Sequence, residues 1–595
     1  MISADKKTVH ILILVGYRGQ GQGFHCQTDT STRSIGPVLC SSFCTFFISV
    51  RSASLLNCEQ QLRFWLLAMA SSEGKLYLGF DFSTQQIKVI AVTEKFEVAY
   101  DEHVQFDVDL PEFKTHGGVH IQPDHVTITT PTRMWVKAFD LLLERMKASK
   151  FPFQNVVAVS GAGQQHGSVF WSTGVNKYLR NLSPDQTMYE QLKDCFSVED
   201  SPVWMDASTR AQCKKLEQAV GGPEILTGIT GSRAYERFTG AQIMKICETR
   251  RDAYDNTERI SLVSSFAASL FIGDYAPIDH SDATGTNLLD IWSRDWSQQC
   301  LEACGPNLAQ KLGPSVHSSE KIGQVSDYLV SRYGFNPDCI VTAFVGDNPA
   351  SLAGLAPGQG DVIVSLGTSD TVFLWLTKPT PGLSGHIMAN PLNRNDFMSL
   401  TCFKNGSLTR ERIRDEKAGG SWEKFSEMLK KTPPGNNGVL GIYFDQMEIQ
   451  PFIEGEYRFD GDGSKVDSFP PEVEVRAVIE GQFIARKVHA ENVGFQLGPK
   501  TRIIATGGGS KNQEILQVLA DIFNSPVYVK DVPNSAGLGC AMRAMHTLEG
   551  GNFSDMAGKA HPSVLVASPG QYTEVYAKLS ARYREFEKMA EDGSL

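Results

Sequence analysis

The sequence predicts an α/β fold of at least two domains, and three observations indicate it. Apolar strand-like runs alternate with helix-like segments from about residue 75 to the end of the chain. A strand, a polar turn and a returning strand occur near residue 79, and the same order recurs near residue 367. The chain has 595 residues, which is several times the size of an ordinary domain. Together these features predict two α/β halves of related plan.

The first half opens with a predicted hairpin. Residues 75–81 and 87–93 have the composition of two strands, and Ser83-Thr84-Gln85-Gln86 forms the turn between them. We expect a helix over 132–149, because its apolar residues recur at helical spacing. Residues 156–160 predict a buried strand, which should end in a glycine-rich turn at Gly161-Ala162-Gly163.

The second half repeats this order. Residues 361–366 and 371–376 are predicted strands, with Gly367-Thr368-Ser369 as the turn. A further strand over 502–505 runs into Thr506-Gly507-Gly508-Gly509-Ser510. A helix is expected over 512–523, with Ile515, Leu516, Leu519 and Ile522 on its buried face.

Residues 1–72 differ from the rest of the chain. They hold four of the twelve cysteines, few acidic residues and no sustained helical or strand period. A transit peptide is one interpretation, since basic, Ser-rich segments poor in acids are typical of it. The favoured interpretation is an alternative start, with Met69 opening the functional chain. We therefore expect an extension outside the fold, either disordered or a non-native start.

Composition excludes several classes of protein. The net charge of −11 argues against a nucleic-acid partner held by phosphate neutralisation. No apolar run approaches the length of a membrane span, so no membrane partner is expected. Two Cys-x3-Cys pairs occur without the further Cys or His that would complete a zinc site. Free thiols in a reducing, cytoplasmic compartment are the expectation.

The two polar turns have the chemistry of phosphate sites. Asp81 stands at a strand end beside Ser83 and Thr84, where a carboxylate can hold Mg²⁺ and hydroxyls can donate to phosphate. The alternative is a hairpin whose side chains only satisfy turn N–H groups. The glycines at 507–509 would let a ligand approach the backbone at a helix start, although an ordinary tight turn has the same composition.

A carboxylate and a polar loop suit a hydroxyl-bearing substrate. Asp347 follows the apolar run 340–344, at a strand end where open α/β sheets bind ligands, and could accept a hydroxyl proton. Its alternative is a helix N-cap. Gln164-Gln165-His166-Gly167 could contact sugar hydroxyls, with Arg237 and Asp206 as further candidates. For His166 the alternative is a structural hydrogen bond, and for Arg237 and Asp206 it is a surface salt bridge or rim.

These motifs, in this order, closely resemble those of the FGGY carbohydrate kinases. The matching segments are Asp81-Phe82-Ser83-Thr84-Gln85, Gly161-Ala162-Gly163-Gln164-Gln165-His166-Gly167, Gly346-Asp347-Asn348, Gly367-Thr368-Ser369 and Gly507-Gly508-Gly509. The similarity covers roughly residues 74–590 and leaves the first seventy or so unmatched. It implies two actin-like (ribonuclease H-like) domains with a catalytic cleft between them. The sugar-binding N-terminal domain would span 74–348 and the nucleotide-binding C-terminal domain 349–590.

The resemblance also implies roles for particular residues. Asp347 matches the general base and, with His166, Arg237 and Asn348, the sugar-contacting positions. Asp81 matches the metal-binding position. The nucleotide-contacting positions are Thr84, Gly367, Thr368, Trp422, Gly508, Gly509 and Asn512. At Lys511, inside the last of these motifs, the family gives no firm expectation.

Within the family, the stretches 160–168, 231–240, 261–270 and 403–408 resemble the members that phosphorylate xylulose. The implied reaction is ATP-dependent, Mg²⁺-assisted phosphorylation of D-xylulose to D-xylulose 5-phosphate. Another family substrate, such as ribulose, gluconate or glycerol, is an open alternative. An actin-like ATPase without kinase activity and a catalytically inactive sugar sensor are two others. Sequence alone fixes neither the oligomeric state nor regulation.

Overall fold

The structure is a computed structural model of the 595-residue chain. It describes residues 74–498, 500–530, 532, 534–560 and 562–595, and the backbone of residues 2–5, 8–16 and 43–51. The chain divides into two compact units, residues 1–74 and 75–595. In the first unit, β1 (Ile2–Asp5), β2 (Thr8–Gly16) and β3 (Phe43–Arg51) pair in an antiparallel sheet. The sequence pattern predicted no strands there; the rest of the expected extension lies outside the described residues.

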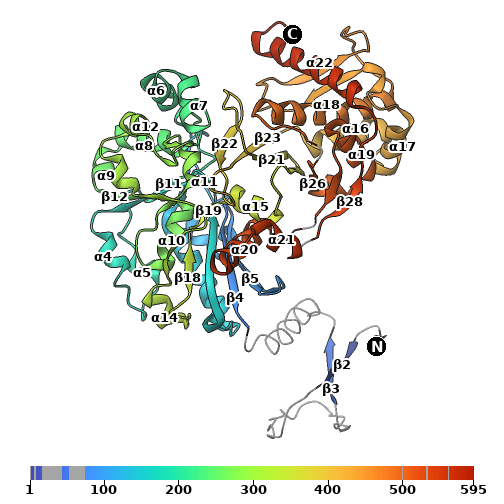
Figure 1. The fold of residues 1–595 in the computed structure, drawn as a ribbon. Helices are drawn as coiled ribbons and strands as arrows, with labels where there is room; N and C mark the ends of the chain where they lie inside the picture. The colour runs from blue at the N-terminus through green and yellow to red at the C-terminus, as the bar shows by residue number, and fades with distance from the viewer. Residues whose placement is uncertain are drawn as a thin grey trace. The chain divides into compact units, whose positions relative to one another are not determined.

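The second unit contains two sheets of the same plan (Figure 1). The first sheet has the order β17-β18-β9-β4-β5-β6, with β19 also paired to β9. The second has the order β22-β23-β21-β20-β26-β27-β28. In each sheet, the first strand of a hairpin also pairs with a parallel strand. In the β4–β5 hairpin β4 pairs with β9, and in the β20–β21 hairpin β20 pairs with β26. The predicted repeat of strand, turn and strand is therefore confirmed.

The strands of the first sheet are β4 (Leu76–Phe82), β5 (Gln86–Thr93), β6 (Val98–Gln105), β9 (Val156–Gly163), β17 (Lys321–Gln324), β18 (Ile340–Thr342) and β19 (Val345–Gly346). Those of the second are β20 (Val362–Leu366), β21 (Asp370–Leu376), β22 (His386–Ala389), β23 (Phe397–Phe403), β26 (Ile503–Thr506), β27 (Val527–Val529) and β28 (Val564–Ala567).

Helices surround the two sheets. In the first lobe (residues 75–346) they include α3 (Thr132–Ala148), α6 (Arg210–Val220), α7 (Pro223–Thr230), α8 (Thr239–Thr249), α10 (Val263–Ile272), α11 (His280–Ala283), α12 (Gln298–Cys304), α13 (Leu308–Leu312) and α14 (Asp327–Tyr333). In the second lobe (residues 362–530 and 562–595) they are α16 (Ser407–Ala418), α17 (Trp422–Lys431), α18 (Pro471–Asn492), α19 (Gln513–Phe523) and α22 (Thr573–Asp592). The helices predicted over 132–149 and 512–523 are confirmed as α3 and α19, and the predicted buried face of α19 is buried.

β4 is buried on both faces, and alternation divides its side chains between them. Leu76, Leu78, Phe80 and Phe82 belong to the core that α3 and α10 share. Tyr77 packs on the opposite face with residues of α20 (Ser535–Glu549). Asp81 has the parity of Tyr77, so its carboxyl lies on the α20 face of the sheet.

Two helices connect the lobes, as Figure 1 shows between the sheets. α20 packs on β4 and β9 of the first sheet and also on α15 (Asp347–Leu355). α15 in turn packs Leu352 and Leu355 against Ile363 and Phe373 of the second sheet. The order of layers is therefore first sheet, α20, α15, second sheet. The predicted domain boundary at 348/349 falls in the first turn of α15.

Glycine makes the contact between these layers close. A Cβ on Gly539 of α20 would lie 2.0 Å from the Ala350 carbonyl oxygen of α15. A Cβ on Gly79 of β4 would lie 1.9 Å from the Gly537 carbonyl oxygen of α20. No side chain fits at such distances, so the two helices and the sheet meet backbone to backbone.

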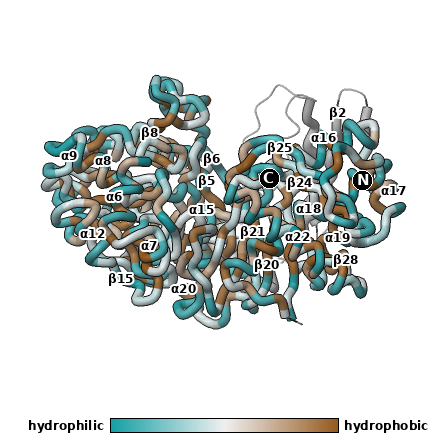
Figure 2. Tube along the Cα trace, turned by 90° about the horizontal axis from the view of Figure 1, so that it is seen from above, coloured by the Kyte–Doolittle hydropathy of each residue, from teal (hydrophilic) through white to brown (hydrophobic). Residues whose placement is uncertain are grey.

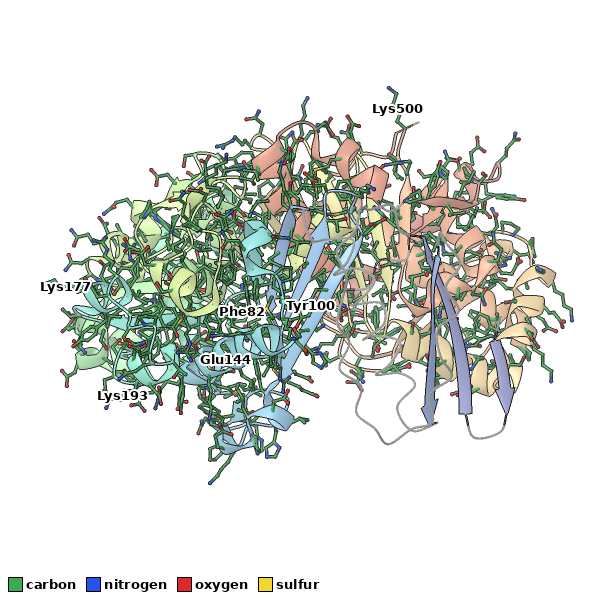
Figure 3. The ribbon with its side chains drawn as sticks, turned by 90° about the horizontal axis from the view of Figure 1, so that it is seen from below. Phe82, Tyr100, Glu144, Lys177, Lys193 and Lys500 are labelled. Carbon is green, nitrogen blue, oxygen red and sulfur yellow. The ribbon has the colours of Figure 1, made fainter. Side chains whose placement is uncertain are left out.

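Hydropathy follows this architecture. Hydrophobic and hydrophilic segments alternate along the chain in both lobes (Figure 2). Charged side chains such as Lys177, Lys193 and Lys500 extend outward in Figure 3. None of the helices in the described part of the chain combines the length and apolar character needed to span a bilayer.

One predicted turn is wrong. Gly161-Ala162-Gly163 are the last three residues of β9 and do not form a turn. A Cβ on Gly161 would lie 2.2 Å from the Phe344 ring, and one on Gly163 would lie 2.3 Å from the Ser264 nitrogen. The glycines therefore serve close packing within the sheet and against α10, which sequence composition does not distinguish from a turn.

Substitution at the helix contact should destabilise the fold. We expect Gly539→Ala to lower the free energy of unfolding by about 1–3 kcal/mol, because its methyl group overpacks the α15–α20 contact. Gly228→Ala is the matched control, since Gly228 also lies in a helix, α7, but a Cβ there meets nothing within 4 Å. Urea unfolding measures both variants. Equal stability of Gly539→Ala and Gly228→Ala would contradict the close contact.

Candidate active site

Two carboxylates lie at the same edge of the first sheet. Asp81 is abreast of Ala162 in the parallel β4–β9 pair, and Val345 of β19 is abreast of Ala162 on its other side. Neighbouring strands are about 4.8 Å apart, so Asp81 and Val345 flank β9 at one level. Asp347 follows two residues later as the first residue of α15. The fold therefore brings together Asp81 and Asp347, which are far apart in sequence.

Neither carboxyl group forms an ion pair among the described residues; Asp81 is buried and Asp347 is partly buried. Ser83 Oγ donates to Asp81 Oδ2 at 2.7 Å, while Asp81 Oδ1 has no hydrogen-bond partner. Burial raises the pKa of Asp81. Burial, and next the negative charge of Asp81, raise the pKa of Asp347 to about 7. An aspartate with this pKa can both accept and release a proton near neutral pH.

The amide side chains of Asn348 and Gln165 form a hydrogen-bonded chain that ends at the Asp347 carboxyl group. Asn348 Nδ2 donates to Asp347 Oδ1 at 3.1 Å and to Gln165 Oε1 at 2.7 Å. Gln165 and the carboxyl of Asp282 lie against Gly346, where a Cβ would be 2.6 Å from Gln165 Cγ and 2.9 Å from Asp282 Oδ1. The sequence predicts Gln165 only as part of a polar loop. No sequence motif contains Asp282, which lies in α11 and reaches the site only through folding.

His166 is placed as a neutral acceptor. Its Nδ1 donates to the Gly285 carbonyl oxygen at 2.9 Å, and its ring stacks on Phe238 with centroids 4.5 Å apart. Burial, and next the positive charge of Arg237, lower the pKa of His166 to about 3. The imidazole is therefore neutral at pH 7, and Nε2 is left to accept a hydrogen bond. Its φ of 69° is in the left-handed region, a strain that recurs at functional sites.

A cavity of 1020 Å³ unites the predicted sugar-site residues. We call it the cleft cavity; Thr84, His166, Arg237, Asp347 and Asn348 line it from the first lobe and from α15. Tyr235, Phe403 and Lys404 also line it, and they lie in the stretches 231–240 and 403–408 that resemble xylulose-phosphorylating members of the family. Trp204, His386 and Glu448 line it as well, although no motif predicted them as site residues.

Trp204 also fixes the first polar turn. Its Nε1 donates to Thr84 Oγ1 at 2.9 Å. Asp206, which was considered for the same pocket, has a different role. Its carboxyl accepts hydrogen bonds from Ile128 N and Ser208 N, both at 2.9 Å. The residue is 2% exposed and does not line the cleft cavity. Asp206 is therefore a buried structural residue, and both the predicted pocket role and its alternative, a surface salt bridge or rim, are wrong for it.

The glycine residues predicted for nucleotide binding meet in the second lobe. A Cβ on Gly507 would lie 2.6 Å from the carbonyl oxygen of Leu366, the residue before Gly367 and Thr368. A Cβ on Gly508 would meet no atom within 4 Å, so the backbone there faces open space. The second polar turn and the glycine triplet are therefore neighbours, and one ligand can reach both.

Asn512 and Trp422 lie at two adjacent helix starts. Asn512 caps α19, where its Oδ1 accepts from Glu514 N and Ile515 N, and its Nδ2 donates to Ser426 Oγ of α17 at 3.0 Å. Trp422 is the first residue of α17, and the Arg414 guanidinium lies 4.8 Å from the centroid of its ring. All of the residues predicted for the nucleotide except Thr84 thus lie in the second lobe. These second-lobe residues do not line the cleft cavity, whereas Thr84 does.

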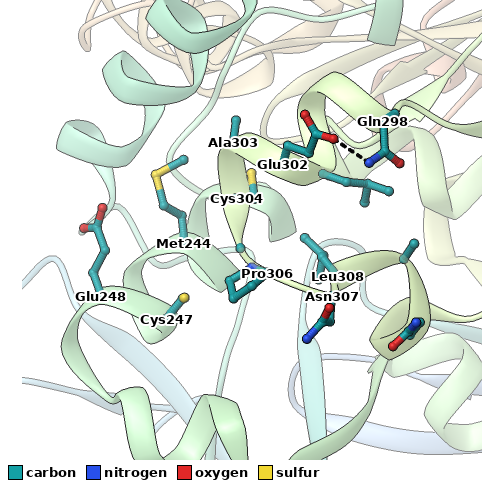
Figure 4. A pocket seen from close by; sticks show the side chains of 14 residues that line it. Met244, Cys247, Glu248, Gln298, Glu302, Ala303, Cys304, Pro306, Asn307 and Leu308 are labelled. Atoms are coloured by element: carbon teal, nitrogen blue, oxygen red, sulfur yellow. Dashed lines mark hydrogen bonds between the residues drawn. The ribbon is translucent and has the colours of Figure 1, made fainter.

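A second hollow, shown in Figure 4, has a different lining. It measures 510 Å³ and lies among α8, α12 and α13 of the first lobe. Its polar groups include the Gln298 and Glu302 side chains, which share a hydrogen bond of 2.6 Å, and the thiols of Cys247 and Cys304. Burial raises the pKa of both thiols, so neither is a thiolate. No predicted site residue lines it, and the cleft cavity is therefore the candidate active site.

Comparison with known proteins agrees with this architecture. The family model described as "FGGY family of carbohydrate kinases, N-terminal domain" matches residues 193–354, and the corresponding C-terminal model matches residues 362–548. A xylulose kinase of Rattus norvegicus is 57% identical over 515 residues, which are 86% of this chain and 96% of the relative. Xylulose kinase 2 of Arabidopsis thaliana is 48% identical over 79% of this chain and 87% of the relative.

A solved structure shows the same fold at low sequence identity. The crystal structure of xylulose kinase from Rhodospirillum rubrum superposes with a TM-score of 0.71 at 14% identity, covering 87% of this chain and 99% of that one. The two-domain α/β fold predicted from the sequence is confirmed. On the family models and the identity to its relatives, the chain is a sugar kinase that belongs to the FGGY family of carbohydrate kinases.

Proposed function

We propose that the chain transfers the γ-phosphoryl group of ATP to D-xylulose and forms D-xylulose 5-phosphate. The observation that carries the proposal is the cleft cavity, where Asp347 stands beside hydroxyl-binding groups from His166, Arg237 and Asn348. The high identity to relatives named xylulose kinases supports the choice of sugar. Residues of both lobes line the cavity, so an approach of the lobes would exclude water from the phosphoryl transfer.

Asp347 would act as the general base. As the primary hydroxyl oxygen of the sugar attacks the γ-phosphorus, its proton passes to the Asp347 carboxylate. The bond between the γ-phosphorus and the bridging oxygen breaks, and ADP leaves with that oxygen. A pKa near 7 makes Asp347 a stronger base than an ordinary aspartate while keeping much of it ionised at neutral pH. Asn348 holds the carboxylate through its 3.1 Å hydrogen bond.

The polar groups facing the base would select the sugar. Neutral His166 can accept from one hydroxyl through Nε2, because Nδ1 already donates to Gly285. The guanidinium of Arg237 can only donate, so it suits an oxygen that accepts, such as the keto group or a hydroxyl. The lining therefore offers an acceptor, a donor and a base in one cavity.

Asp81 fits a magnesium ion. Its Oδ1 is a buried carboxylate oxygen without a partner, which is a suitable ligand for a hard cation. No group of three or more His, Cys, Asp or Glu side chains among the described residues could hold a metal ion by itself. This agrees with Mg²⁺, which is commonly held by one or two carboxylates together with water and phosphates. A bound Mg²⁺ would neutralise charge on the ATP phosphates.

The two polar turns would hold the phosphates. Thr84 supplies a hydroxyl from the first lobe, and Gly367 and Thr368 supply backbone N–H groups and a hydroxyl from the second. Gly508 leaves the backbone open to the adenosine, Gly509 packs closely on Leu366 of the second turn, and Asn512 and Trp422 stand at the neighbouring helix starts. Such preorganised donors supply most of the catalysis in phosphoryl transfer.

A panel of acceptors tests the substrate. With purified protein and MgATP, D-xylulose should give ADP in a one-to-one ratio with sugar phosphate, at a kcat/KM higher than ribulose, gluconate or glycerol. An enzyme-coupled ADP assay with chromatography of the product measures both. A larger kcat/KM for another acceptor would replace the proposed substrate, and ADP release without sugar phosphate would favour an ATPase.

The base is tested by Asp347→Asn. We expect kcat to fall by at least about 100-fold, because proton acceptance is lost. Nucleotide affinity, measured by titration calorimetry, should stay close to that of the parent, since the nucleotide residues lie in the second lobe. Asp295→Asn, at an exposed carboxylate of the first lobe, is the control and should remain fully active. A kcat near that of the parent in Asp347→Asn would rule out the role of base.

The raised pKa predicts an unusual pH profile. Because Asp347 must be ionised to act as base, log kcat/KM should fall with unit slope as the pH drops below about 7. Asp81→Asn should be less active, and its remaining activity should fall at a lower pH, since the charge of Asp81 raises the pKa of Asp347. A parent profile that stays flat down to about pH 5, as an ordinary aspartate would give, contradicts the assignment.

A further inference from the structure

A small basic cavity lies apart from the cleft cavity and shares none of its lining residues. It measures 160 Å³. His317 and Ser319 line it from the first lobe, Arg394 and its neighbours Pro391 and Leu392 from the second, and Arg543, His546 and Thr547 from α20. We call it the basic cavity. It lies where the two lobes and one of their connecting helices meet.

Two polar atoms in this lining are buried without a partner. His317 is 6% exposed, and its Nδ1 accepts from Ser319 N at 3.2 Å. The proton of the neutral ring is therefore on Nε2, which is buried and has no hydrogen-bond partner. Thr547 Oγ1 is likewise buried without a partner. Unpartnered buried donors are rare, because each costs about 1–3 kcal/mol.

The cavity is also rich in positive charge. Arg543 is 3% exposed, and its guanidinium donates to Ser160 Oγ at 3.2 Å and to the carbonyl oxygens of Ser318 and Ala343. Among the described residues, no carboxylate forms an ion pair with Arg543, and buried cations are ordinarily paired. Arg394 pairs with Glu320 but stays 60% exposed. Burial, and next Arg394 and Arg543, lower the pKa of His317 to about 3, which reflects this positive surrounding.

We propose that the basic cavity binds a small tetrahedral oxyanion of the phosphate class. The charge of Arg543 and Arg394 attracts the anion, and His317 Nε2 and Thr547 Oγ1 donate hydrogen bonds to its oxygens. The size allows it: a water needs about 10–15 Å³ of volume on this measure, so a cavity of 160 Å³ has room for a small anion such as phosphate. The ligand satisfies both orphaned donors and the unpaired cation at once.

Binding there has a structural consequence. The anion would contact a first-lobe segment, a second-lobe loop and α20, so it would stabilise the lobes in the arrangement of this structure. A ligand that binds only the native state raises its stability with the logarithm of one plus the ratio of ligand concentration to Kd. Inorganic phosphate should therefore raise the melting temperature of the protein more than chloride at equal ionic strength.

Titration calorimetry of the full chain with inorganic phosphate tests the site directly. Xylulose and a non-hydrolysable ATP analogue are kept in excess, so that phosphate cannot enter the cleft cavity. We expect one phosphate for each chain. Thr547→Val, which keeps the volume of the side chain but removes the hydroxyl, should weaken its binding about tenfold or more, and so should Arg394→Gln. Both variants should keep the parent's sugar kinase activity without phosphate.

Arg180→Gln is the matched control, because Arg180 is also 60% exposed and is paired with one carboxylate, that of Asp274. It should bind phosphate as the parent does. His317→Leu should abolish binding, and His317→Gln, which restores an N–H donor, should recover part of it. If His317→Leu does not fold, Thr547→Val and Arg394→Gln still decide.

Three results would overturn the proposal: no phosphate binding tighter than about 10 mM, equal binding by parent and variants, or displacement of phosphate by the nucleotide analogue. None of them is a measurement of sugar phosphorylation, and the variants lie outside the cleft cavity. A failure of the basic cavity is therefore distinguishable from a failure of the proposed kinase function, which the acceptor panel measures.

Discussion

Two carboxylates packed at one edge of the first sheet without an ion pair are the constraint on which the site depends. Asp81 and Val345 flank β9 at one level, Asp347 follows Val345 by two residues, and neither aspartate forms an ion pair among the described residues. Burying unpaired charge opposes folding, so their strands must be fixed by strong packing elsewhere. The same burial raises the pKa of both groups and leaves Asp81 Oδ1 free for a ligand. The cost to stability and the proposed chemistry have one physical origin.

The packing that fixes them is the layered contact of sheet, α20, α15 and sheet. Gly79 meets Gly537, and Gly539 meets Ala350, at distances that exclude any Cβ. Because Asp347 is the first residue of α15, this contact sets the height of the proposed base above the first sheet. The same helix packs on the second sheet through Leu352 and Leu355. The position of Asp347 is thus tied to both lobes, as a residue between sugar and nucleotide must be.

Much of this could be predicted from the sequence, and the failures have physical causes. The hairpins at Asp81 and Gly367 follow from apolar strand-like runs bounded by turn residues, and Asp347 follows from a strand end. Gly161 and Gly163 led to a wrong prediction, because close packing and a turn both require glycine. Asp282 and His386 could not be predicted, since only long-range folding brings Asp282 against Gly346 and His386 into the cavity lining. Asp206 was polar and near the motif, yet its hydrogen bonds make it structural.

The most direct measurement of the central claim is a crystal structure with D-xylulose and a non-hydrolysable ATP analogue bound together. The account predicts the sugar in the cleft cavity, with its primary hydroxyl within about 2.6–3.2 Å of the Asp347 carboxylate and its other oxygens near His166 and Arg237. The γ-phosphate should lie between that hydroxyl and the turns at Thr84 and Gly367. A sugar whose primary hydroxyl faces another group, or one bound outside the cleft cavity, would contradict the account.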